Sequence, residues 1–270
     1  MRYLLLVFLF ITPISFSNEF AETSELNVKL ISDCNKLPKN GKFSTGILFN
    51  LQPGWHLYWI NPGDAGLAPN IHWDLSSQIT TGSIQWAFPH VIELDSISNF
   101  GYSGQLLLPV SMQTKNMTEN KTELIADVNW LVCKDICIPG KAKLAKSFVV
   151  TDACEKNSNA NLFADWAKKI PENTELMDGT VSIVDRKLQL ELFLTQTIFQ
   201  NAVTVDIFIE NTQVVSYQST QSQRWKNNWV LWKQDLNDAF VNLPEKINLV
   251  IVVDHLKSYR VQLSTQEQST

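Results

Sequence analysis

Short apolar segments separated by turn signals recur along the first 150 residues, and they constrain the fold more than any other feature. Residues 26–32 alternate apolar and polar side chains, and residues 141–150 do the same after a Pro-Gly pair. Between these segments, the polar stretch TKNMTENK separates two β-prone runs, as the loop of a hairpin would. Strands of this length with turns at this spacing favour a β-sandwich or a barrel.

An aromatic, turn-rich stretch at residues 52–75 interrupts the strand pattern. Its Pro and Gly residues are too frequent for a helix, and its aromatic content is too high for a disordered linker. We therefore expect a long ordered loop that packs on the sheet. The aromatic residues expected to pack there are Trp55, Tyr58, Trp59 and Trp73.

The character of the chain changes after Cys154. The segment SNANLFADWAKKIPEN begins with capping residues, has apolar residues at helical spacing and ends at a proline. We expect a short amphipathic helix there, followed by a β-rich block without cysteine that has the size of one sandwich domain. The predicted architecture is all-β, with one sandwich at residues 18–155, a helical linker at 156–174 and a second sandwich at 175–270.

The first 17 residues, MRYLLLVFLFITPISFS, have the pattern of a secretory signal peptide. Arg2 precedes an apolar core, and the small residues Ser15 and Ser17 stand where a signal peptidase would cleave. Export removes a protein from the cytosolic thiol pools, so disulfides become possible. The net charge of −5 and the pI near 5.4 argue against binding to nucleic acid, which needs clustered basic residues.

All four cysteines, Cys34, Cys133, Cys137 and Cys154, lie in the first predicted domain. Four cysteines allow three pairings. In a continuous strand Cys133 and Cys137 would be about 13 Å apart, so they can bond only if residues 134–136 form a turn. A bond between Cys34 and Cys154 would close a loop of over a hundred residues and would stabilise the fold by about 4–5 kcal/mol. The Cys34–Cys154 pair therefore has the features of a structural disulfide. A Cys133–Cys137 bond would close a very short loop, so it would stabilise the fold little, and its position on a turn suits thiol exchange.

Other chemistries for the CxxxC pair find less support. Without further context, such a pair in an exported β-domain is more often structural than redox-active. A zinc site would need a CxxC motif elsewhere or an HxxxH motif, and the sequence has neither. The CxxCH motif of haem attachment is also absent. His56 and His72 lie among aromatic residues and are expected to pack in the loop. We therefore expect no metal and no cofactor.

Three motifs, in order, carry a resemblance to a known family. They are PGWHLYWINPGDAGLAPNIHWDL at 53–75, NFGYSGQLLLPV at 99–110 and WLVCKDICIPGKAKL at 130–144. Together they resemble the N-terminal periplasmic domain of the thiol:disulfide interchange protein DsbD, in particular the subgroup that includes the copper-tolerance protein ScsB. The resemblance covers residues 24–150, and the second half fits the longer N-terminal region of that subgroup by its general β character.

The resemblance implies immunoglobulin-like sandwiches and a periplasmic protein-disulfide reductase. Cys133 and Cys137 would be the redox pair, with Cys137 forming the mixed disulfide with partners and Cys133 resolving it. Cys34 and Cys154 would form the structural disulfide. An aromatic cap loop at residues 96–104, with Phe100 and Tyr102 as candidate cap side chains, would cover the redox pair until a partner displaces it, although Asn99 stands where the family pattern has a phenylalanine.

The family also implies the partners. Electrons would come from a thioredoxin-like or membrane-embedded donor, here on a separate chain, because the family's membrane segment and thioredoxin-like domain have no counterpart in this sequence. They would pass to oxidised periplasmic proteins such as disulfide isomerases or components of cytochrome c maturation. The opposite charges of Lys134 and Asp135 nearly cancel, so no strongly acidic thiol is expected. The alternative is a non-catalytic periplasmic interaction module with two structural disulfides.

Overall fold

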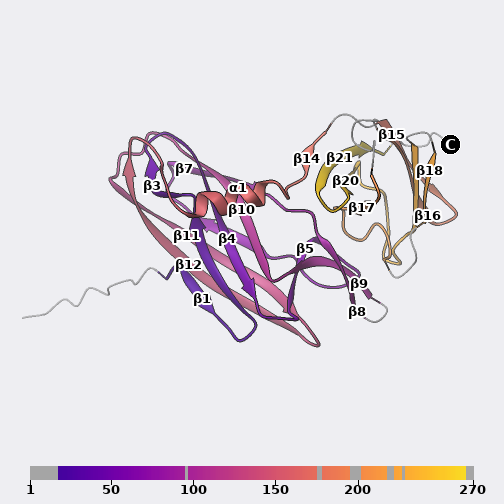
Figure 1. Cartoon of the computed structure of the whole chain (residues 1–270), viewed down its shortest axis with the longest axis horizontal. Helices are drawn as coiled ribbons and strands as arrows, with labels where there is room; N and C mark the ends of the chain where they lie inside the picture. The colour runs from indigo at the N-terminus through magenta and orange to yellow at the C-terminus, as the bar shows by residue number, and fades with distance from the viewer. Residues whose placement is uncertain are drawn as a thin grey trace, which may run out of the picture.

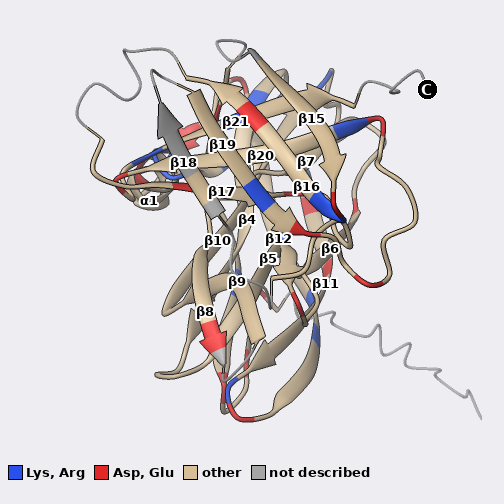
Figure 2. Ribbon diagram, turned by 90° about the vertical axis from the view of Figure 1, so that its right-hand side faces the viewer, with Lys and Arg blue, Asp and Glu red and all other residues tan. Residues whose placement is uncertain are grey.

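The computed structural model describes residues 18–94, 97–174, 178–194, 202–217, 222–226 and 229–265. Within these ranges the chain forms β-sheets and one short helix, arranged as two blocks (Figure 1). The predicted signal peptide, residues 1–17, lies outside the described residues. No described helix is long and apolar enough to cross a membrane. On the side shown in Figure 2, acidic and basic residues are interspersed over both blocks.

Two sheets make up the first block, which comprises residues 18–156. One sheet has the order β1-β2-β4-β10-β7, and the other has the order β13-β3-β12-β11-β5-β9-β8, with β6 paired to β11. The bounds of the first sheet are β1 Phe20–Glu22, β2 Leu26–Ser32, β4 Gly41–Leu51, β10 Gln105–Thr114 and β7 Ile79–Ile84. The bounds of the second are β13 Glu155–Lys156, β3 Cys34–Pro38, β12 Cys137–Thr151, β11 Lys121–Cys133, β5 His56–Gly63, β9 Ile97–Ser103, β8 His90–Leu94 and β6 Asn70–Asp74.

The alternation predicted for the first strand brings its apolar side chains into the core between the sheets. Leu26, Val28 and Leu30 of β2 are fully buried, and they belong to one apolar cluster with residues of both sheets. Within that cluster, the Phe49 and Trp130 rings from opposite sheets meet edge to face, with centroids 5.7 Å apart. The hairpin predicted around TKNMTENK does not form, because β10 pairs with β4 and β7 while β11 pairs with β12.

The stretch at residues 52–75 is not one long loop, so that expectation was wrong. It contains β5, which pairs with β9 and β11, and β6, which pairs with β11. Four consecutive residues of β5, His56 to Trp59, are buried, so the strand lacks the period-two pattern of a half-exposed strand. Its aromatic residues do pack as expected, since Trp55, Trp59 and Trp73 all contact the first core.

The predicted helix forms as α1, Asn159–Ala167. Its buried residues, Phe163 and Trp166, belong to the core of the first block, so the linker helix lies on that sandwich (Figure 1). Trp166 also lies under the Lys169 ammonium, which is 4.4 Å from the ring centroid. The chain then enters the second block through β14, Glu172–Asn173.

Two four-stranded sheets make up the second block, which comprises residues 172–265. Their orders are β14-β21-β20-β17 and β15-β16-β19-β18. The bounds of the strands after β14 are β15 Asp178–Val184, β16 Lys187–Phe193, β17 Val205–Ile209, β18 Ser222–Lys226, β19 Trp229–Asp235, β20 Lys246–Val253 and β21 Lys257–Ser264. The two sheets enclose a second apolar core, so the all-β expectation is confirmed for the described residues.

The sheet that contains β17 and β20 is apolar on both faces. Ile207 and Ile209 of β17 lie in the core of the second block, whereas Phe208 between them lies in the core of the first. The same alternation appears in β20 over residues 249–252. One face therefore closes the second core and the other packs on the first block, which joins the blocks through buried apolar surface.

Candidate redox site

A disulfide joins the two strands of the longest hairpin at its tip. Strand β11 ends at Cys133 and β12 begins at Cys137, and these two residues are partners in the ladder. The amide of Lys134 donates to the carbonyl of Ile136 at 3.0 Å, which closes the turn. The Cα atoms of the two cysteines are 4.1 Å apart and their sulfurs are bonded. This turn is the one that the four-residue spacing requires.

The two cysteines of this disulfide differ in their exposure. Cys133 is 1% exposed, whereas Cys137 is an exposed residue at the start of β12. The turn residues between them are exposed as well, and Ile136 is 65% exposed. An incoming thiolate can therefore approach Cys137, while the fold shields Cys133.

The hydroxyl of Tyr58 contacts the shielded sulfur. It donates to Sγ of Cys133 at 2.9 Å and lies 3.8 Å from Sγ of Cys137. Strand β5 places it there because His56 is the ladder partner of Cys133, and Tyr58, two residues later, projects from the same face. Burial raises the pKa of the Tyr58 hydroxyl, so it remains a protonated donor at neutral pH.

His56 lies beside this tyrosine. Its ring meets the Tyr58 ring edge to face, with centroids 5.2 Å apart, and it is buried. Its Nε2 atom has no hydrogen-bond partner among the described residues. Burial lowers the pKa of His56, so the imidazole is neutral at pH 7. The expectation that His56 packs in the interior is met on a strand rather than a loop, whereas His72 on β6 is exposed.

The predicted cap side chains lie elsewhere in the structure. Residues 97–103 form strand β9 rather than a loop, and Ser96 lies outside the described residues. Because Gly101 is the ladder partner of Tyr58, Phe100 and Tyr102 project from the opposite face of the sheet. Phe100 and Tyr102 both belong to the first core, and the Tyr102 hydroxyl donates to the carbonyl of Ala87 at 2.7 Å. Neither ring covers the sulfurs in this conformation, and Tyr58 takes that position instead.

The second disulfide, between Cys34 and Cys154, has a different setting. Its partners are 120 residues apart in sequence, with Cα atoms 5.6 Å apart. Cys34, at the start of β3, is fully buried, and Cys154 is half-buried just before β13. It therefore closes the long loop that the sequence favoured for a structural bond. The cluster of Asp33, Cys34 and Cys154 has the composition of a metal site, but both its sulfurs are in this bond, and the Asp33 carboxylate pairs with Lys156.

An apolar hollow of about 540 Å³ lies along the β11–β12 hairpin whose tip carries Cys133 and Cys137. Its lining comes from three segments: Leu67, Ala68 and Asn70 before and at the start of β6, Asn129–Trp130 of β11 and Pro139–Lys141 of β12. Gly140 lies against the Trp130 ring so closely that a Cβ atom there would be 2.2 Å from a ring carbon. The lining of the hollow therefore begins on β12 two residues after Cys137.

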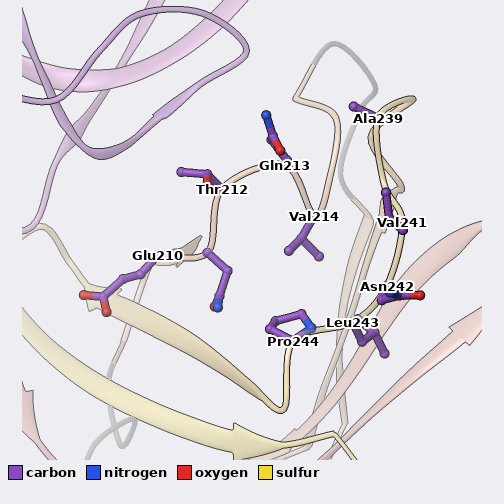
Figure 3. Close-up of a pocket in the computed structure, with 10 residues that line it drawn as sticks. Glu210, Thr212, Gln213, Val214, Ala239, Val241, Asn242, Leu243 and Pro244 are labelled. Carbon is purple, nitrogen blue, oxygen red and sulfur yellow. The ribbon is translucent and has the colours of Figure 1, made fainter.

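A second hollow, of about 550 Å³, lies in the second block (Figure 3). It is lined by residues 210–214 and by Ala239 with residues 241–244. Glu210 is its single titratable lining residue, and that carboxylate is engaged by the Arg260 side chain at 2.9 Å. Its lining offers neither a cysteine nor a histidine, and its one carboxylate is paired with Arg260, so this hollow lacks the groups for thiol exchange.

Residues 31–148 match the family model described as the N-terminal part of thiol:disulfide interchange protein DsbD. This segment contains Cys133, Cys137 and Tyr58. Residues 31–148 belong to the DsbD N-terminal family. A search of curated proteins gave no match.

One solved structure supports the same fold over most of the chain. The N-terminal periplasmic domain of ScsB from Proteus mirabilis is 18% identical, with a TM-score of 0.71, over 93% of this chain and 100% of that chain. Domains 5–6 of the S-layer protein SbsC are 13% identical over 89% of this chain and 97% of that chain, with a TM-score of only 0.22. The first likeness, together with the DsbD family match, confirms the expected immunoglobulin-like β fold.

Sequence reasoning missed the role of Tyr58, which it treated as a packing residue. The signal available was the spacing of His56 and Tyr58, which lie on one face if the segment is a strand. The assumption of a loop concealed that spacing. The site therefore has one exposed cysteine, one buried cysteine and a hydroxyl that donates to the sulfur of the buried one.

Proposed function

We propose that this protein relays reducing equivalents in the periplasm by thiol–disulfide exchange at Cys133 and Cys137. The observation that carries the proposal is the unequal setting of the two sulfurs: Cys137 is exposed, and Cys133 is buried against the Tyr58 hydroxyl. An exchange disulfide needs one sulfur that partners can reach and one that stays with the protein. Membership of the DsbD N-terminal family supports the same assignment.

The reduction step begins with attack on the exposed sulfur. A thiolate of the electron donor attacks Sγ of Cys137, the Cys133–Cys137 bond breaks, and Cys133 leaves as a thiolate that accepts the Tyr58 hydrogen bond. The second thiolate of the donor then attacks the donor's sulfur in the mixed disulfide. The donor departs as a disulfide and Cys137 is released as a thiolate, so two electrons have moved and the protons are taken up from water.

The delivery step is the reverse sequence with a different partner. The Cys137 thiolate attacks the disulfide of an oxidised protein and forms a mixed disulfide, and one sulfur of that protein leaves as a thiolate. Cys133 then attacks Sγ of Cys137, which restores the Cys133–Cys137 bond and releases the partner as a dithiol. Cys137 is thus the sulfur that bonds to partners, and Cys133 is the resolving cysteine.

The partners follow from the family resemblance. The donor is a thioredoxin-like or membrane-embedded DsbD-type protein on another chain, and the acceptors are disulfide-containing proteins of the isomerase or cytochrome c maturation type. A role in copper tolerance follows from the subgroup. The hollow lined by Leu67, a residue 66% exposed, and by Pro139, two residues after Cys137, offers apolar surface for such a partner.

The organisation of the chain is part of the proposal. Residues 1–17 would be removed on export as a signal peptide, and residues 18–155 would form the DsbD N-terminal-like redox domain. Residues 156–174 would link it to a second sandwich domain at 175–270. The buried sheet face between the blocks supports a fixed arrangement of the two domains.

A trapping experiment tests the assigned roles. The Cys133→Ala variant keeps Cys137 but removes the resolving sulfur, so it should accumulate mixed disulfides with partners in a periplasmic extract. The matched Cys137→Ala variant keeps only the shielded sulfur and should trap little. Equal trapping by both variants would contradict the assignment of roles.

A second experiment separates exchange from a structural role. Mild dithiothreitol followed by alkylation and mass spectrometry should show the Cys133–Cys137 bond opening well before the Cys34–Cys154 bond, since only the first is on an exposed turn. If both bonds resisted equally, the non-catalytic interaction module would be the better account of the protein.

A further inference from the structure

Strand β5 continues from the redox site into the junction between the two blocks. Asn61, three residues after Tyr58, is 1% exposed. Its side-chain amide lies within hydrogen-bond distance of three acceptors of the second block: the carbonyl of Ile209 at 2.7 Å, the hydroxyl of Tyr217 at 3.0 Å and the carbonyl of Asn211 at 3.3 Å. Burial raises the pKa of Tyr217, so that hydroxyl stays neutral. The second block therefore fixes this point of β5.

The residues that follow Asn61 are held from both sides. The amide of Gly63 donates to Oδ1 of Asn61 at 3.1 Å. The Asp64 carboxylate accepts from the amide of Tyr217 at 2.9 Å and from the amide of Ser98 at 3.0 Å, so it connects the second block to β9. We call residues 61–65 the clamped segment, because the side chains of Asn61 and Asp64 bond to the second block and the Asp64 carboxylate and the Ala65 amide bond to β9.

The clamped segment leads directly onto the ring of Tyr58. Gly66 has a φ of +113° and lies flat against that ring, since a Cβ atom there would be 2.3 Å from a ring carbon. Only glycine allows so close an approach with this backbone conformation. The position of Gly66 therefore limits where the Tyr58 ring can lie, and the ring carries the hydroxyl that reaches Cys133.

We propose that the second block controls the reactivity of the Cys133–Cys137 disulfide through Asn61 and Tyr217, which are positioning residues for Tyr58. The proposal rests on the exchange function above and adds a role for the second block in it. The clamped segment presses Gly66 on the Tyr58 ring, and the ring holds its hydroxyl on the sulfur that must leave as a thiolate. Without the clamp the hydroxyl loses this geometry, and the bond opens more slowly.

The structure also shows why the second block is suited to this role. Phe208 packs edge to face on Trp59, the residue next to Tyr58, with ring centroids 6.0 Å apart. Phe100 on the neighbouring strand contacts both Phe208 and Tyr217, at centroid distances of 5.1 and 4.6 Å. The acceptors of Asn61 are thus set in a packed aromatic contact, which makes the clamp rigid.

A double-mutant cycle on the full chain tests the proposal. The measurement is the rate at which dithiothreitol opens the Cys133–Cys137 bond. Asn61→Ala should slow that rate by about three- to tenfold: a misplaced group at a reacting centre can cost up to about a hundredfold, but the effect here cannot exceed that of losing the Tyr58 hydroxyl altogether. In a Tyr58→Phe background, Asn61→Ala should have almost no further effect, because the hydroxyl that it positions is already absent.

Two further variants keep the test decisive. Gly66→Ala displaces the Tyr58 ring without touching the second block and should reproduce the slowing, while Tyr217→Phe removes a single acceptor and serves if Asn61→Ala does not fold. Asn50→Ala is the matched control, because Asn50 accepts a hydrogen bond from Gln105 on the neighbouring strand within the first block. It should leave the rate unchanged.

The outcomes separate the two proposals. If the wild-type bond opens first but Asn61→Ala and Tyr217→Phe leave its rate unchanged, the clamp is refuted and the exchange function stands. An equal slowing by Asn61→Ala in both backgrounds would also refute the clamp, since the effect would not pass through Tyr58. If the wild-type bond does not open first, the exchange function itself fails.

Discussion

Removal of one hydroxyl, in Tyr58→Phe, gives the most direct test of how the site works. The hydroxyl is buried and donates to Cys133 Sγ at 2.9 Å, so no water can replace it without a rearrangement. A hydrogen bond to a charged group contributes about 1.5–3 kcal/mol, whereas one to a neutral disulfide sulfur contributes much less. The hydroxyl therefore stabilises the Cys133 thiolate more than the disulfide.

The difference between these two hydrogen-bond energies determines the expected effect of Tyr58→Phe. The pKa of the Cys133 thiol should rise by about 1–2 units in Tyr58→Phe, because one pKa unit corresponds to about 1.4 kcal/mol. Reductive opening should slow by about tenfold, which is less than the full thiolate effect because the leaving sulfur carries only part of the charge at the transition state.

The assays are simple. The opening rate is measured with dithiothreitol under excess reductant, and the Cys133 thiol is titrated by thiolate absorbance in a Cys137→Ser background. Tyr259→Phe is the matched control, since that tyrosine lies on β21 in the second block. A Tyr58→Phe rate within twofold of wild type, with an unchanged thiol pKa, would refute the role of the hydroxyl.

Three further predictions concern stability. The double variant Cys34→Ser/Cys154→Ser should lose about 4–5 kcal/mol in the free energy of unfolding, measured by denaturant titration, because the bond closes a long loop. Burial lowers the pKa of His56 in the folded protein, so on acidification the unfolded chain binds the His56 proton first. The contribution of His56 to the free energy of unfolding is therefore fully present above about pH 6.5. Below that pH it falls by at most about 1.4 kcal/mol per pH unit. His56→Phe should flatten the decrease in melting temperature between pH 7 and pH 5, and an unchanged slope would contradict this. Phe208→Ala should cost about 3–5 kcal/mol by denaturant titration, since its ring fills the core of the first block; a loss under about 1 kcal/mol would mean that the junction is loosely packed.

The redox hairpin illustrates what the sequence could predict. Spacing alone required residues 134–136 to turn if Cys133 and Cys137 were to bond, and loop length favoured Cys34 with Cys154 as the staple. Both bonds are present. The exposure difference between Cys133 and Cys137 could not be predicted, because it depends on β5 lying beside β11 at a point 75 residues away in sequence.

Strand β5 illustrates what the sequence concealed. A strand covered on both faces shows no alternation, so His56 to Trp59 appear as an aromatic run rather than a strand. The Pro and Gly residues at 62 and 63, which argued for a loop, lie at the end of that strand. The cap prediction failed to place Phe100 and Tyr102 on the disulfide for a related reason, because the face from which a strand residue projects depends on the ladder register.

The sequence does contain a sign of the contact between the blocks, in a strand that is apolar on both faces and therefore shows no alternation. The segment INLVIVV at 247–253 has apolar residues at five consecutive positions, as expected for a strand buried on both faces. From the sequence we predict only that this strand belongs to the second sandwich, and we do not predict a partner for the second apolar face. Its second apolar face needs a partner, and the structure supplies the first block, through Val250 and Val252.

In the exchange that we propose, Cys133 must both leave and attack, and a tyrosine beside its sulfur suits both roles. Burial raises the pKa of Tyr58 above its ordinary value near 10, while an ordinary thiol has a pKa of about 8.5, so the proton stays on the tyrosine and Cys133 can exist as a hydrogen-bonded thiolate. A lysine or arginine in the same place would lower the thiol pKa further. That would make Cys133 a better leaving group but a weaker nucleophile, since nucleophilicity falls as the pKa falls. A neutral donor of high pKa balances these demands, because the same sulfur must depart when the bond is reduced and return when the partner is released.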